Sequence, residues 1–155
     1  MTVENTKRTI QLSIDKEQIR KGIYAESACI ALLSPADGRP PVITDDNRAL
    51  VYVYIEKAFV ELVSSLAAFV DAAGFSIPEG EEIIVLPLLV DGTCKALPNV
   101  VRRMVENALS AAVLGYCYES RRELSATLFE RRDGLMARLR RLLSGEGGRR
   151  CSTWL

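Results

Sequence analysis

The chain has 155 residues, of which 48% are hydrophobic, with 20 basic and 20 acidic side chains and no histidine. This length and apolar content predict one domain with a full core that needs neither a metal nor a disulfide framework, and the zero net charge argues against a uniformly acidic or basic partner. The lack of histidine removes the commonest general base, the commonest metal ligand and the Ser-His and Cys-His pairs of nucleophilic enzymes.

The first elements are predicted from alternation and capping. Apolar and polar residues alternate near residues 9–14, which predicts a half-buried strand. Asp15 follows as an N-cap, with Gln18 in the position of its capping-box partner. We therefore expect a first helix over about residues 16–33, and the prolines and glycine of residues 35–41 predict a loop after it.

A long second helix is predicted from residues 44–46, whose carboxylates suit a helix N-terminus, to Ala73, before Gly74. This helix is apolar on more than one face, which is typical of a helix in the centre of a core or at a subunit interface. We therefore expect the chain to self-associate. The side chains of the second helix that we expect in the core are Phe59, Leu62, Leu66 and Phe69.

A second strand is predicted near residues 82–90, where Pro87 favours an edge position. It could pair with residues 9–14 in this chain or in a neighbouring one. Leu97 and Pro98 then open a third helix, since proline suits the first helical turn. We expect this helix to break near Ser120.

A fourth helix with a leucine stripe follows, and glycines end it near residue 145. The sequence thus predicts a mainly α fold, a bundle of about four helices with one or two short strands. We expect a single helical domain over residues 1–145 and a flexible tail over residues 146–155. Trp154 in this tail is a candidate for docking on a neighbouring chain, because tryptophan is enriched in interface hot spots.

The familiar catalytic and cofactor motifs are absent. No glycine-rich phosphate loop or dinucleotide fingerprint occurs, and the scattered cysteines exclude a four-cysteine zinc site. We expect Cys29 and Cys117 to be buried as small hydrophobes, and Cys94 and Cys151 to be exposed. Acidic residues such as Asp45 are assigned to helix capping rather than to a metal. No cofactor, metal or enzymatic activity is expected.

Residues 120–155 hold nine arginines against four acidic residues, so this segment carries a net charge of +5 and the rest of the chain −5. The candidate interaction residues here are Arg131, Arg132, Arg138 and Arg141. A solvated helix face is the favoured interpretation. Contact with the acidic part of a neighbouring subunit, or with nucleic acid, are the alternatives. Nucleic acid is the less favoured partner, since no aromatic residues interleave with the arginines to stack on bases.

The order of elements resembles small helical head–tail connector or adaptor proteins of tailed phages and prophages. The likeness rests on TDDNR at residues 44–48 leading into the long apolar helix, on LGYCY at residues 114–118, and on the basic last helix. It covers residues 44–143 and implies a structural role in a ring around the portal exit. The two strand-like segments depart from that pattern.

These observations predict a structural or interaction protein that binds itself and other proteins of an assembly. The alternative is a nucleic-acid-binding helical module that uses the arginine-rich helix. Residues 1–14 are polar, which argues against a signal peptide, and charged residues interrupt the longest apolar stretch, residues 49–70, which argues against a membrane span. We therefore expect a cytoplasmic protein, or one assembled in a virion if it is phage-derived.

Overall fold

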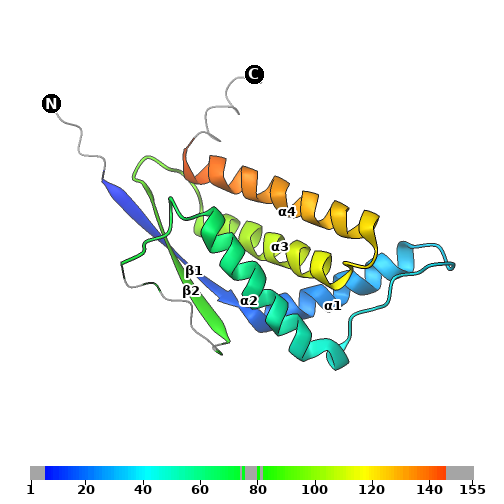
Figure 1. The fold of residues 1–155 in the computed structure, drawn as a ribbon. Coiled ribbons are helices and arrows are strands. Elements are labelled where there is room, and N and C mark those ends of the chain that lie inside the picture. Colours follow the sequence, from blue (N-terminus) through cyan, green and yellow to red (C-terminus); the bar gives the residue numbers. More distant parts are fainter. Residues whose placement is uncertain (1–5, 74, 76–79, 81, 146–155) are drawn as a thin grey trace, which may run out of the picture.

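The computed structural model describes residues 6–73, 75, 80 and 82–145. Over these residues the fold is mainly helical, with four α-helices and one two-stranded antiparallel sheet, which confirms the predicted fold class. In Figure 1 the strands lie to the left of the helices. The elements in chain order are β1 (Lys7–Asp15), α1 (Lys16–Leu33), the 3-10 turn η1 (Asp45–Asn47), α2 (Arg48–Ser65), β2 (Ile83–Asp91), α3 (Pro98–Cys117) and α4 (Arg122–Leu143).

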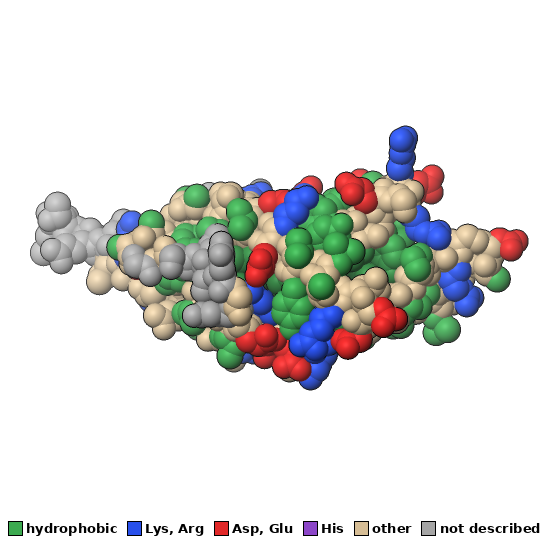
Figure 2. Space-filling view, turned by 60° about the horizontal axis from the view of Figure 1, so that its bottom comes forward, with side chains coloured by type: hydrophobic (Ala, Val, Ile, Leu, Met, Phe, Trp, Pro, Cys, Tyr) green, Lys and Arg blue, Asp and Glu red, His purple; other side chains and the backbone are tan. Residues whose placement is uncertain are grey.

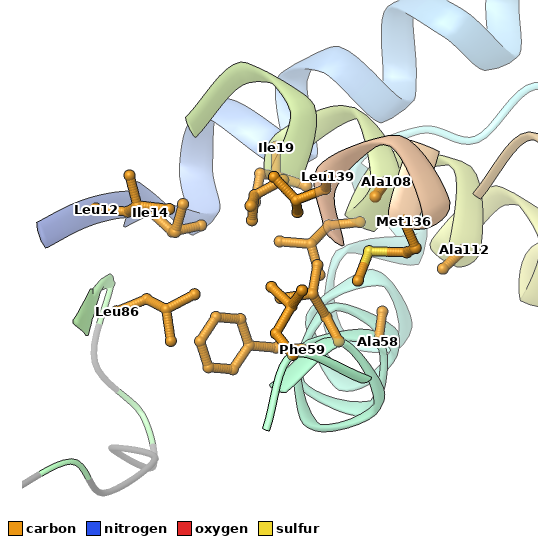
Figure 3. Close-up of a cluster of buried hydrophobic side chains, with 14 of the residues drawn as sticks. Leu12, Ile14, Ile19, Ala58, Phe59, Leu86, Ala108, Ala112, Met136 and Leu139 are labelled. Atoms are coloured by element: carbon orange, nitrogen blue, oxygen red, sulfur yellow. The ribbon is translucent and has the colours of Figure 1, made fainter. Parts of the chain in front are cut away.

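The sheet forms within the chain. β1 and β2 pair without a bulge, from Lys7 opposite Asp91 to Asp15 opposite Ile83. The alternation noted in the sequence places one face of each strand in the core, and Figure 3 shows Ile14 and Leu86 near Phe59 of α2. The side chains that the sheet buries are Ile10, Leu12, Ile14, Ile84, Leu86, Leu88 and Val90.

The first helix has the predicted bounds and the predicted N-cap residue. Asp15 ends β1 and caps α1, because its Oδ1 accepts a hydrogen bond from the backbone N–H of Glu17 at 2.9 Å. Ile19, Ile23 and Ser27 stand four residues apart on the buried face of α1. A strand therefore passes directly into a helix with no intervening loop.

The predicted length of the second helix is wrong, because α2 ends at Ser65 and does not continue to Ala73. After α2 the chain reaches the outer edge of β2. The N–H of Leu89 donates to Phe69 O at 2.6 Å, and the N–H of Asp71 donates to Pro87 O at 3.0 Å. This edge of β2 needs backbone partners, and a helix continued to residue 73 would withhold them.

The helix α3 packs against α4, α2, α1 and β1 and is the central helix of the fold. It has the predicted start at Pro98 and ends at Cys117, just before the predicted break. Gly115 allows α4 to approach closely, because a β-carbon at this position would lie 2.8 Å from the ring of Phe129. The hydroxyl of Ser125 donates to Gly115 O at 2.9 Å and ties the start of α4 to α3.

Candidate interaction surfaces

Two of the four candidate arginines on α4 turn back onto acidic residues of the same chain. Arg131 forms an ion pair with Glu26 of α1. Arg132 lies 3.4 Å from a carboxylate oxygen of Glu61 on α2. The basic segment thus meets part of the acidic segment within one molecule.

Arg138 and Arg141 differ from these two. Both are exposed, and neither makes an ion pair with any other residue that the structure describes. The structure therefore pairs two of the four candidates with carboxylates of the same chain and leaves the other two in solvent. The fifth candidate, Trp154, lies outside the described residues together with the rest of the predicted tail.

A groove of about 220 Å³ runs between α2 and α4. Its apolar lining comes from α2, α3 and α4. Arg132 and Arg140 stand at its rim on α4, and Arg140 donates a hydrogen bond to the hydroxyl of Ser65 on α2. The apolar residues that line the groove are Ala58, Leu62, Ala108, Leu109, Ala112 and Met136.

A cluster of aromatic rings lies beside this groove. Tyr116 of α3 packs against Tyr54 of α2 at 5.4 Å and against Phe129 of α4 at 5.2 Å between ring centroids. Its hydroxyl donates to Glu61, and the ammonium group of Lys57 lies 4.2 Å from its ring centre. Burial, reinforced by the bond to Glu61, raises the pKa of Tyr116 to about 12, so this hydroxyl stays protonated at neutral pH and acts as a donor.

The structure reveals two buried cations on α1 that sequence reasoning missed. Lys16 is only 2% exposed, and its Nζ lies 3.2 Å from Glu56 of α2. Arg20 is buried too, and its Nη1 lies 3.0 Å from Asp45 of η1. Their spacing on the same face as Ile19 was the available signal. Their carboxylate partners anchor α1 to the middle of α2 and to η1.

An exposed apolar stripe lies on α2, opposite its buried face. Leu50, Val53 and Val60 are 47%, 59% and 46% exposed. Spacings of three and seven residues place them on one side of the helix. Figure 2 shows hydrophobic side chains in patches among charged ones on one face of the molecule. We call Leu50, Val53 and Val60 the α2 stripe.

The cysteine predictions hold only in part. Cys29 is exposed, because it lies off the buried face of α1, and this corrects the expectation of burial. Cys94 is buried, against prediction, since its loop packs on the end of α4 and its Sγ donates to Leu142 O at 3.3 Å. Cys117 is partly buried, which raises the pKa of its thiol to about 11.

Within the described residues no group of three acidic or cysteine side chains could hold a metal ion, and no helix is long and apolar enough to cross a membrane. No protein-family model, curated protein or solved structure matches the chain.

Proposed function

We propose that this chain is a structural or interaction protein that self-associates or docks in a larger protein assembly. The α2 stripe is the observation that carries the proposal. One face of α2 packs in the core while Leu50, Val53 and Val60 remain in solvent on the other. Exposing apolar surface to water is unfavourable, and burying it against a second protein surface removes that cost.

The surroundings of the stripe suit a protein contact. Lys57 lies within the stripe, but its ammonium group sits over the Tyr116 ring, so its charge is directed toward α3. The stripe therefore presents aliphatic carbon together with the stem of a lysine. Apolar carbon with few charges is the composition that distinguishes the centre of an interface from its rim.

The experiment is a mass measurement by light scattering at micromolar concentrations. We expect a mass above the 17.1 kDa of one chain. Val60→Lys should lower that mass, because it places a charge in the stripe. Val42→Lys is the matched control, since Val42 is also 46% exposed but lies in the loop before η1. A 17.1 kDa monomer for the unmodified chain would contradict self-association.

The second candidate function is nucleic-acid binding by α4. It is favoured by Arg138 and Arg141, which are exposed and have no ion-pair partner among the described residues. Its test is retention of DNA or RNA at increasing salt. Phosphate contacts make affinity fall steeply with ionic strength, and Arg138→Gln with Arg141→Gln should then give a shallower slope. Retention that is weak and unchanged by the substitutions would reject this candidate.

We propose a phage or prophage virion as the assembly, on the resemblance in the order of elements alone. In that case, the neighbouring genes should encode portal, capsid or tail proteins. Neighbours of unrelated function would remove this part of the proposal and leave self-association standing.

A further inference from the structure

One edge of β1 has no strand beside it among the described residues, because the sheet consists of β1 and β2 alone. Along a strand, the backbone N–H and C=O groups of successive residues point to opposite edges. Those of Pro87 and Leu89 bond to residues 69–71 at the outer edge of β2, so the backbone groups of Leu88 point toward β1. Leu88 pairs with Ile10. The backbone groups of Ile10, Leu12 and Ile14 are thus used within the sheet, and those of the odd-numbered residues between them point outward.

The two edges of the sheet differ in their protection against pairing with another strand. The outer edge of β2 carries Pro87, which has no N–H to offer, and is partly covered where Val70 bridges to Leu88. β1 has no proline and no bulge, and no charged residue lies between Arg8 and Asp15. Natural proteins commonly protect an exposed strand edge with a proline, a bulge or a charged residue. An edge that lacks all three is prone to pair with another strand.

The β1 sequence is complementary to itself. In an antiparallel pair related by a two-fold axis through Gln11, Lys7 lies opposite Asp15 of the second copy, and Thr9 lies opposite Ser13. A cation meets a carboxylate at each end of the pair, and a threonine meets a serine on each side of the axis. A shift of the axis by one residue, to Ile10, places Lys7 opposite Ser13 and loses the charge match.

We propose that β1 pairs with β1 of a second copy of this chain in this register. The resulting sheet has the order β2-β1-β1-β2. Thr9, Gln11 and Ser13 of the two copies would exchange about six backbone hydrogen bonds. The pairing keeps Ile10, Leu12 and Ile14 of both copies on the helix-covered face. A symmetric, isologous contact of this kind closes on itself as a dimer. The inference rests on the proposed self-association and adds a contact between two copies that is separate from the α2 stripe.

Disulfide trapping tests the register. With Cys29 and Cys151 replaced by Ser, Gln11→Cys places two thiols directly opposite each other on the exposed face of the sheet. The two α-carbons would then be about 5.5 Å apart, within the range of a disulfide. Ser13→Cys is the matched control, because its two copies would be roughly 13 Å apart along the strands. We expect mild oxidation to give at least tenfold more covalent dimer from Gln11→Cys.

A second comparison separates this interface from self-association in general. Gln11→Pro removes an outward N–H that the sheet does not use, whereas Gln11→Thr changes the side chain and keeps that N–H. We expect Gln11→Pro to lose the β1 contact, which lowers the mass measured by sedimentation, and Gln11→Thr to keep it. Both variants are compared only if their circular dichroism spectra match that of the unmodified chain. Should Gln11→Pro fail to fold, disulfide trapping decides alone.

The outcomes are distinct. Equal trapping of Gln11→Cys and Ser13→Cys, or an unchanged mass for folded Gln11→Pro, would overturn the β1 proposal while self-association through another surface stands. A 17.1 kDa monomer for the unmodified chain at all concentrations would overturn both proposals.

Discussion

Replacement of Gly115 by alanine tests the close approach of α3 and α4. A β-carbon at this position would lie 2.8 Å from two atoms of the Phe129 ring. Contacts that short do not persist, so the ring must move. Phe129 packs against Tyr116 at 5.2 Å between centroids, and the guanidinium of Arg132 lies 4.8 Å from its ring centre. Movement of the ring would therefore disturb both of those contacts.

The magnitude follows from two opposing effects. Alanine stabilises a helix interior by about 1 kcal/mol relative to glycine. Overpacking of a closely packed site costs about 1–3 kcal/mol. Gly134 of α4 supplies the control, since a β-carbon there would meet no atom within 4 Å. We expect Gly134→Ala to stabilise the protein and Gly115→Ala to be about 1–3 kcal/mol less stable than Gly134→Ala.

Urea denaturation followed by circular dichroism measures these differences. Phe129→Ala should make the effect of Gly115→Ala more favourable, because the atoms that the new methyl group would contact are gone, and the double-mutant cycle isolates that coupling. Equal stabilisation by Gly115→Ala and Gly134→Ala would show that the two helices are not in close contact at this point and would refute the reasoning.

Three further predictions concern the core, the basic helix and the thiols. Leu66→Ala should lower the free energy of unfolding by about 2–5 kcal/mol, since Leu66 is fully buried; a loss below about 1 kcal/mol in the same urea assay would contradict its place in the core. Arg138→Gln and Arg141→Gln should each change the free energy of unfolding by less than about 0.5 kcal/mol and leave the oligomer intact. If these substitutions and high salt both weaken assembly, the two arginines belong to a subunit interface instead. At pH 8 a maleimide should label Cys29 well before Cys117. Cys29 is exposed, whereas the Cys117 thiol, with its pKa raised to about 11, stays protonated until the pH approaches that value. Mass spectrometry of the labelled peptides measures the order, and labelling of Cys117 first would contradict the prediction.

Features that depend on neighbouring residues in the chain could be predicted from the sequence. The cap at Asp15, the bounds of α1 and the proline at the start of α3 all follow from short-range backbone chemistry. The alternation in β1 likewise identified its buried face, because a strand has a side-chain period of two.

Features that depend on residues distant in the chain were decided only by the tertiary structure. The end of α2 at Ser65 is one, since the backbone of Phe69 pairs with β2 and the apolar pattern carries no sign of that pairing. The arginines of α4 are another, because Arg131 and Arg132 pair with carboxylates on α1 and α2. The periodicity of a segment determines which of its faces is buried. The packing of the other segments against that face determines which polar groups meet and where a helix must end to supply a partner to a strand.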